Sequence, residues 1–375
     1  MHSVILMGQK SFFSVESVGV NGLTKEKYQG FIVGTDSIRE GRYILYFDNG
    51  RVFQEGFYKN GKPDSVWITY YSSSARKSLF NYKSGEKKGS FTFWNSDGTL
   101  YQTGEYENNK LTDTLITYHS NGQIDSKSSY LNGLLNGISV VYSTSGDLRL
   151  VSEYRNDTLN GIWKTYYDTG ELNYLGTKKN GKYIDTLYTY YKSGRLQRKA
   201  FYVDGEINGI LVGYFENGSV SETLNFNHGI QEGEFFSFFE NGLIMERGRY
   251  LKDKKNGDWV SYYPNGQIYS NGGFKDGLFD GRWIVYHDNG LFKQIGNYSS
   301  GKANGRWFYY DKNGSLLLIG SYINDKHNGI WTTFYPNGDV AGRIFYINGA
   351  PIAVKWLYES TGTLVKQMDL VIGQK

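Results

Sequence analysis

The chain has 375 residues, with 41 Lys and Arg against 37 Asp and Glu, which gives a net charge of +4. So small an excess argues against strong electrostatic attraction to nucleic acid or to an anionic membrane surface. Cysteine is absent, which excludes disulfides and thiolate metal sites. The 34 Tyr, 22 Phe, 8 Trp and 48 Gly favour strands joined by tight turns.

The first segment of the chain, residues 1–40, departs from the pattern that follows it. Its apolar stretch from Val4 to Met7 is too short for a signal peptide and has no basic start. A cytoplasmic location is therefore the default expectation, with export as the alternative if this stretch is the end of a clipped signal peptide. We expect residues 1–40 to form an N-terminal cap over the first edge of a sheet.

From residue 41 onward the sequence repeats with a fixed period. A glycine returns every 24 residues, and Ser74 stands at the one mark where it is missing. Fourteen units follow one another without insertion or deletion, which predicts stacked identical units. The anchor glycines are Gly50, Gly98, Gly122, Gly146, Gly170, Gly194, Gly218, Gly242, Gly266, Gly290, Gly314, Gly338 and Gly362.

Positions counted from each anchor form columns of similar residues. Position −4 is aromatic in all fourteen units. Position −7, the tryptophan column, holds six of the eight tryptophans. Glycine is frequent at position +6, the glycine column, and Tyr or Phe predominates at position +8, the tyrosine column.

The spacing within a unit predicts two short strands and leaves no room for a helix. Pro264 and Pro336 stand two residues before their anchors, where their fixed φ excludes a type I′ turn. A type I turn followed by a left-handed anchor glycine fits instead, and it pairs position −4 with position +2. From strict alternation we expect these two positions to share a face with the glycine and tyrosine columns, opposite the tryptophan column.

We therefore predict an all-β fold, an elongated antiparallel meander of about fourteen β-hairpin repeats of 24 residues in a single-layer twisted sheet. Residues 41–350 form the repeat array, and residues 351–375 form a degenerate last repeat with a C-terminal cap.

Four tryptophans in consecutive units are the sharpest candidates for binding. Trp259, Trp283, Trp307 and Trp331 would line up at roughly 10 Å intervals on one face. They could stack sugar rings or anchor a protein partner. The competing interpretation, which a single-layer sheet favours, is that they pack across neighbouring strands and against the glycines.

A second candidate is the apolar stretch in residues 300–320. Phe308, Tyr309 and Leu316–Ile319 place large apolar side chains at positions that vary between units. We expect a contact patch around them.

Motifs for catalysis or cofactor binding are missing. The Gly-Lys pairs at 61–62, 181–182 and 301–302 are not followed by Ser or Thr, so we interpret them as turns and not as phosphate loops. There is no nucleophile elbow and no paired-histidine zinc motif. We expect no enzymatic activity, cofactor or metal, with a hydrolase hidden in the array as the alternative.

The pattern Gly-x-Trp-x-x-Tyr-Tyr-x-x-Gly-x-Leu-x-x-x-Gly-x-Tyr resembles the MORN repeat. The stretches from Gly257 to Gly266 and from Gly329 to Gly338 match best, and the match covers about residues 41–350. The bacterial variant in YwqK-like antitoxins is the more similar form. The resemblance implies an elongated sheet of hairpins and an interaction scaffold, with roles in membrane-lipid binding or toxin neutralisation in some members.

The expected function is a non-enzymatic scaffold that binds a protein partner, with an antitoxin or immunity role as one form of it. The alternative is a binder of glycans or other polymers through the row of tryptophans. The low net charge argues against nucleic acid and does not support a membrane lipid as partner.

Overall fold

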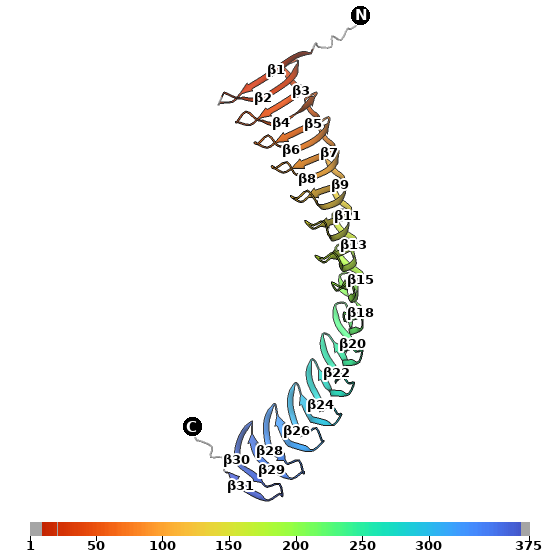
Figure 1. The fold of residues 1–375 in the computed structure, drawn as a ribbon, viewed down its shortest axis with the longest axis vertical. Coiled ribbons are helices and arrows are strands. Elements are labelled where there is room, and N and C mark those ends of the chain that lie inside the picture. The colour runs from red at the N-terminus through yellow and green to blue at the C-terminus, as the bar shows by residue number, and fades with distance from the viewer. Residues whose placement is uncertain (1–9, 21, 369–375) are drawn as a thin grey trace. The chain divides into compact units, whose positions relative to one another are not determined.

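The computed structural model describes residues 10–20 and 22–368. These residues form strands and turns, with no helix among them, and the strands pair antiparallel. The predicted all-β class and hairpin meander are therefore confirmed. The chain divides into two compact units, residues 1–183 and 184–375. Within each unit, strands pair with their neighbours in sequence, and Figure 1 shows this succession of hairpins.

The strands of the first unit are β1 (Ser11–Val18), β2 (Thr24–Val33), β3 (Asp36–Tyr46), β4 (Val52–Lys59), β5 (Lys62–Tyr70), β6 (Arg76–Lys83), β7 (Glu86–Trp94), β8 (Leu100–Glu107), β9 (Lys110–Tyr118), β10 (Ile124–Leu131), β11 (Leu134–Tyr142), β12 (Leu148–Arg155), β13 (Thr158–Tyr166) and β14 (Leu172–Lys179).

Strand β15 (Lys182–Tyr190) contains the boundary between the units. The second unit continues with β16 (Leu196–Val203), β17 (Glu206–Ile207), β18 (Gly209–Tyr214), β19 (Val220–Asn227), β20 (Ile230–Phe238), β21 (Ile244–Leu251), β22 (Lys254–Tyr262), β23 (Ile268–Lys275), β24 (Leu278–Tyr286), β25 (Phe292–Ser299), β26 (Lys302–Tyr310), β27 (Leu316–Ile323), β28 (Lys326–Phe334), β29 (Val340–Ile347), β30 (Ala350–Tyr358) and β31 (Leu364–Met368).

The anchor glycine closes each hairpin as the prolines predict. At Gly50, φ is +79°, and its N–H donates to the carbonyl of Phe47 at 2.9 Å. The Phe47 N–H donates in turn to the carbonyl of Arg51, and Tyr46 pairs with Val52. This is a type I turn followed by a left-handed residue, so the predicted loop is confirmed.

The second connection is a two-residue turn in most repeats. Asn60 and Gly61 both have positive φ, at 49° and 76°, which is the conformation of a type I′ turn. Gly181 and Gly301 adopt similar values of 80° and 82°. The Gly-Lys pairs therefore lie in turns between strands, as predicted.

The predicted assignment of faces is wrong because each hairpin contains a β-bulge. Leu45 pairs with Gln54 while the next residue, Tyr46, pairs with Val52, so Phe53 is left without an opposite residue. One extra residue reverses which face the rest of the strand presents. The tryptophan column consequently shares its face with the glycine and tyrosine columns. We call this face the tryptophan face.

The tryptophan face is the core of the sheet. Trp259 and Trp307 are each 1% exposed. A Cβ on Gly248 would overlap the ring of Trp259, and a Cβ on Gly296 would overlap the ring of Trp307. The missing side chain lets the indole lie flat against the neighbouring strand, which is why glycine recurs at that column. The predicted packing of tryptophans against glycines is confirmed for these rings.

Hydrogen bonds from side chains near the turn tie each hairpin to the next. The Asn265 side chain accepts the N–H of Gln267 at 3.0 Å and donates to the Asp288 carbonyl at 3.3 Å. The Tyr263 hydroxyl donates to the Tyr286 carbonyl at 2.9 Å. The Asn-Gly pair thus fixes the turn and also the spacing to the following repeat.

The segments predicted to be caps contain strands at both ends of the described residues. Residues 11–18 form β1, a strand paired with β2, and residues 350–358 form β30, which pairs with β29 and β31. The apolar stretch from Val4 to Met7, whose alternative interpretation was a clipped signal peptide, and residues 369–375 at the end of the predicted C-terminal cap lie outside the described residues.

Candidate functional site

The four candidate tryptophans lie side by side in sequence order on the tryptophan face, but their rings are covered. Trp331 is 5% exposed, and Trp283 is half-buried. Each is T-shaped against a tyrosine or phenylalanine of the tyrosine column, such as Tyr322 against Trp331 at 4.9 Å between ring centroids. The indole Nε1 of Trp331 donates to the Ser321 carbonyl at 3.2 Å. These contacts keep the rings in the packed core of the tryptophan face.

The side chains at position −11, counted from the anchor glycine, also cover the tryptophan rings. The ammonium group of Lys255 lies 3.8 Å from the centroid of the Trp259 ring. Phe279 and His327 occupy the same position beside Trp283 and Trp331, with centroids 4.6 and 4.1 Å apart. Stacking of a sugar needs an exposed ring face. The rings of Trp259, Trp307 and Trp331 do not provide one.

Phe308 and Tyr309 are half-buried neighbours on β26 that point to opposite faces. Tyr309 lies on the tryptophan face, where its hydroxyl is 3.3 Å from that of Tyr322. Burial raises the pKa of Tyr309 far above its usual value, so it stays a neutral phenol. Phe308 pairs with Ile319 on the other face.

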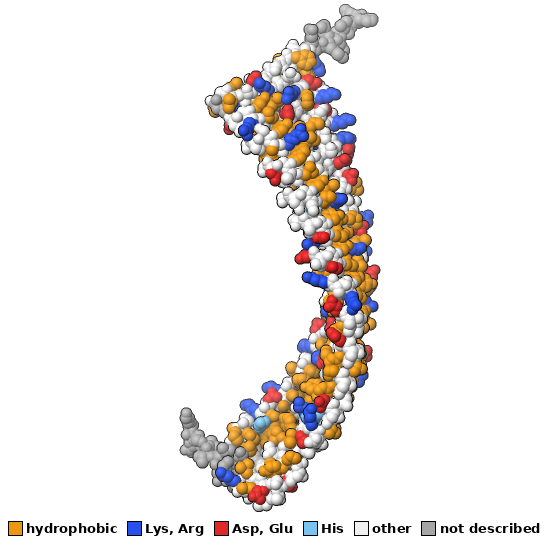
Figure 2. All heavy atoms as spheres, viewed as in Figure 1, with side chains coloured by type: hydrophobic (Ala, Val, Ile, Leu, Met, Phe, Trp, Pro, Cys, Tyr) orange, Lys and Arg blue, Asp and Glu red, His pale blue; other side chains and the backbone are white. Residues whose placement is uncertain are grey.

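An open hollow of about 670 Å³ lies on the tryptophan face beside Tyr309. It spans strands β26 to β30, where Figure 2 shows hydrophobic side chains gathered. Tyr309 and Leu318 border it on the side of the preceding repeat, and Leu357 borders it on the side of the following one. We call this the apolar hollow. Its other lining residues are Tyr322, His327, Trp331, Thr333, Ala341, Gly342, Arg343, Ile344 and Tyr346.

One cross-strand pair that lines the apolar hollow is small. Tyr309 pairs with Leu318 in one repeat, and the equivalent pair in the next repeat is Thr333 with Gly342. The step from two large side chains to a threonine and a glycine leaves space above the sheet. Sequence reasoning found Tyr309 but missed this pair.

The walls of the apolar hollow carry little charge. No Asp or Glu is among the described residues that line it. The Arg343 guanidinium lies over the Tyr358 ring, 5.7 Å from its centroid. Arg343 pairs with Thr332, and the side chains of this pair lie on the face of the sheet opposite the hollow. His327 Nε2 is hydrogen-bonded to the Tyr322 hydroxyl at 3.2 Å, and burial lowers the pKa of His327. The hollow therefore suits a neutral, apolar group near neutral pH.

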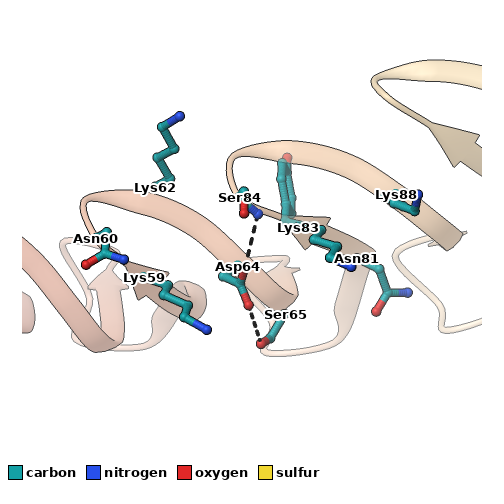
Figure 3. A pocket seen from close by; sticks show the side chains of 10 residues that line it. Lys59, Asn60, Lys62, Asp64, Ser65, Asn81, Lys83, Ser84 and Lys88 are labelled. Carbon is teal, nitrogen blue, oxygen red and sulfur yellow. Dashed lines mark hydrogen bonds between the residues drawn. The ribbon is translucent and has the colours of Figure 1, made fainter.

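A second hollow, of about 700 Å³, lies in the first unit and is polar. Figure 3 shows the side chains that line it, which come from β4, β5, β6, β7 and the turns between them. We call this the polar hollow. It is lined by Lys59, Asn60, Lys62, Asp64, Ser65, Asn81, Tyr82, Lys83, Ser84 and Lys88.

Two of the charged residues that line the polar hollow, Asp64 and Lys88, form structural contacts. Asp64 accepts hydrogen bonds from the Ser84 N–H at 3.1 Å and from the Ser65 hydroxyl, and the Ser84 bond lowers the pKa of Asp64. Glu40 accepts the Asn60 N–H in the equivalent way. Lys88 is ion-paired with Glu107 at 2.6 Å. Asp64 thus serves the connecting turn, as its equivalent does one repeat earlier.

Residues 10–20 and 22–368 contain no group of three or more His, Asp or Glu side chains placed to hold a metal ion. The same residues contain no helix long and apolar enough to cross a membrane.

Several solved structures resemble the chain weakly. A crystal structure of TcdB2–TccC3 with Cdc42 matches with 12% identity and a TM-score of 0.17, over 92% of this chain and 22% of that chain. The pore of the Photorhabdus luminescens Tc holotoxin matches with 12% identity and a TM-score of 0.16, over 92% of this chain and 23% of that one. The chain therefore spans less than a quarter of those chains, and scores this low carry no argument.

No curated protein matches the sequence. Six segments do match the family described as "MORN repeat variant": residues 39–60, 114–132, 159–180, 255–276, 303–324 and 328–348. Each segment contains one anchor glycine, so the matches follow the same frame as the repeat and the hairpins. Together they support a MORN repeat protein.

Proposed function

We propose that this chain is a non-enzymatic protein-binding scaffold and that the apolar hollow is a contact site for its partner. MORN repeats in an antiparallel sheet fit a binding scaffold. The observation that carries the proposal is the apolar hollow itself, which lies over the small pair Thr333 and Gly342 and is lined mainly by apolar and aromatic side chains. A pocket of this size and apolar lining is typical of ligand sites.

The preceding repeat indicates what would fill the hollow. There the equivalent positions carry Tyr309 and Leu318, so the sheet itself accommodates an aromatic ring and a branched aliphatic chain at this level. A partner side chain of similar bulk, such as Leu, Met or Phe, would bury its apolar surface against Trp331, Tyr346 and Leu357. Each such side chain contributes about 1.5–3 kcal/mol when buried.

A toxin is one class of partner that this proposal includes, as the resemblance to the antitoxin variant suggests. The hollow would then neutralise it by covering an apolar side chain that the toxin needs. The alternative of glycan binding lacks exposed ring faces on Trp259, Trp307 and Trp331.

The test compares affinity capture by the purified full chain with capture by Thr333→Tyr. Tyr is the residue of the preceding repeat, so the variant fills the hollow with a side chain that the sheet already accommodates. Thr117→Tyr makes the same change at the same position of another repeat and serves as the control. We expect one stoichiometric partner whose binding is at least about tenfold weaker with Thr333→Tyr alone. Equal capture by all three chains would refute the hollow as the contact site.

A further inference from the structure

Strand β1 lies at the edge of the sheet in the first unit (Figure 1). Among the described residues it pairs with β2 only. No strand of residues 10–20 and 22–368 lies opposite the backbone N–H and C=O groups on its other side, and such an edge is a template for another strand.

The sequence of β1 lacks the usual protection of an edge. Ser11–Val18 contains no Lys and no Pro, and its one charged residue, Glu16, is ion-paired with Lys27 at 3.0 Å. The strand is rich in Phe and Val, which favour strand pairing. Strand β31 differs, because it carries the exposed Lys366. Among the described residues, the N-terminal edge is thus the less protected one.

Two large apolar side chains of β1 point to solvent on the same face. Phe12 is 74% exposed and Val18 is 60% exposed. Both have even numbers, and the even positions of this strand are exposed while Phe13, Val15 and Ser17 are half-buried. Phe12 and Val18 lie three residues on either side of Val15, so the strand is symmetric about that residue.

We propose that β1 pairs antiparallel with β1 of a second copy of this chain, with Val15 opposite Val15 on the twofold axis. An antiparallel edge contact related by a twofold axis keeps each residue opposite one of the same face. The pairing places Phe12 of each copy opposite Val18 of the other, which covers both exposed side chains. It also places Glu16 opposite Ser14, so no like charges meet.

The neighbouring register is less favourable. Centring the pair on Ser14 would place Phe12 opposite Glu16, an apolar ring against a carboxylate, and Lys10 opposite Val18. Exposed Phe12 and Val18 would then remain without apolar partners. The side chains therefore specify the register centred on Val15.

A single engineered cysteine tests the register directly, since the chain has no cysteine of its own. In the proposed dimer the two Val15 Cα atoms lie about 4.5–5.5 Å apart, within the range that a disulfide spans. We expect Val15→Cys in the full chain to form a disulfide-linked dimer on mild oxidation. Ser14→Cys on β1 and Val365→Cys on the exposed face of β31 are the matched controls and should stay largely monomeric. Equal cross-linking of all three variants, or none, would overturn the register.

Sedimentation tests the association without cross-linking. The unmodified chain should show about twice the monomer mass at high concentration and dissociate on dilution. Phe12→Lys combined with Val18→Lys places lysines opposite each other and should give monomer only. Phe12→Glu combined with Val18→Lys places opposite charges there and should restore the dimer. Both side chains are exposed, so the fold should survive, which circular dichroism checks. An unmodified chain that stays monomeric overturns the proposal.

Discussion

The polar hollow of the first unit and the apolar hollow of the second unit lie in different copies of the same 24-residue repeat. In the polar hollow, Asp64 and Lys88 are engaged by the Ser84 backbone and by Glu107, so its polarity supports the turns. In the apolar hollow, a threonine and a glycine replace the large pair of the preceding repeat, and no described side chain fills the space. A hollow in this sheet therefore suggests binding only where the side chains of the repeat leave it unfilled.

The largest expected difference between the two hollows is in stability. Trp331 forms a wall of the apolar hollow and is 5% exposed, so Trp331→Ala should lower the free energy of unfolding by about 3 kcal/mol. Chemical denaturation followed by circular dichroism measures the loss. A change below about 1 kcal/mol would show that the tryptophan face is not the core.

The apolar hollow should also make stability depend on pH through His327. Burial lowers its folded-state pKa below the unfolded value, so its contribution is fully present above about pH 6.5 and is lost as the pH falls through the folded-state pKa. Stability should fall between neutral and mildly acid pH, by less than the loss in Trp331→Ala. His327→Phe follows Phe279 in the equivalent position of an earlier repeat and should reduce this dependence. Urea unfolding at several pH values measures it, and an unchanged slope in the variant would contradict the assignment.

The turn that joins β5 and β6, at the end of these strands away from the polar hollow, can be made more stable. Ser74 occupies the one anchor mark without glycine and still adopts a φ of +74°. A residue with a Cβ is strained there, so Ser74→Gly should raise the free energy of unfolding by about 1 kcal/mol. Ser84→Gly, at another positive φ of 51° within the polar hollow, offers a comparison in a different turn type. Loss of stability in Ser74→Gly would argue against the shared turn geometry.

The smallest effect is expected in the polar hollow. Lys88 is exposed, and its ion pair with Glu107 is a surface contact. Lys88→Ala should change the free energy of unfolding by less than about 1 kcal/mol, and less still at high salt. Denaturation at low and high ionic strength checks this. A loss as large as that of Trp331→Ala would mean that the polar hollow is more than a by-product of the turns.

The sequence was sufficient to predict the period, the hairpins and the turn, because Pro264 and the anchor glycines each allow few backbone conformations. It also indicated that Trp259 and Trp307 pack against glycines. The assignment of faces failed at the β-bulge. In the first repeat the extra residue is Phe53, and the residues at the equivalent position of the other repeats share no side-chain type that would reveal the bulge.

The sequence identified one residue that borders the candidate site and missed two others. Tyr309, from the apolar stretch in residues 300–320, borders the apolar hollow, and the contact patch expected around that stretch stays a prediction. Thr333 and Gly342 were missed because a hollow is made by small side chains, which give no signal unless the pairing and the face are known. Comparing cross-strand pairs between adjacent repeats, once the bulge is included, would have found them.

Selection of a random-peptide display library on the immobilised full chain tests the central claim most directly. The claim is that the buried tryptophan, glycine and tyrosine columns hold the repeats together. A partner then binds where Thr333 and Gly342 replace the large cross-strand pair of the preceding repeat. We predict enrichment of peptides with a Leu, Met or aromatic residue whose binding is lost in Thr333→Tyr and kept in Thr117→Tyr. Enriched peptides that bind Thr333→Tyr as well as the unmodified chain would contradict it.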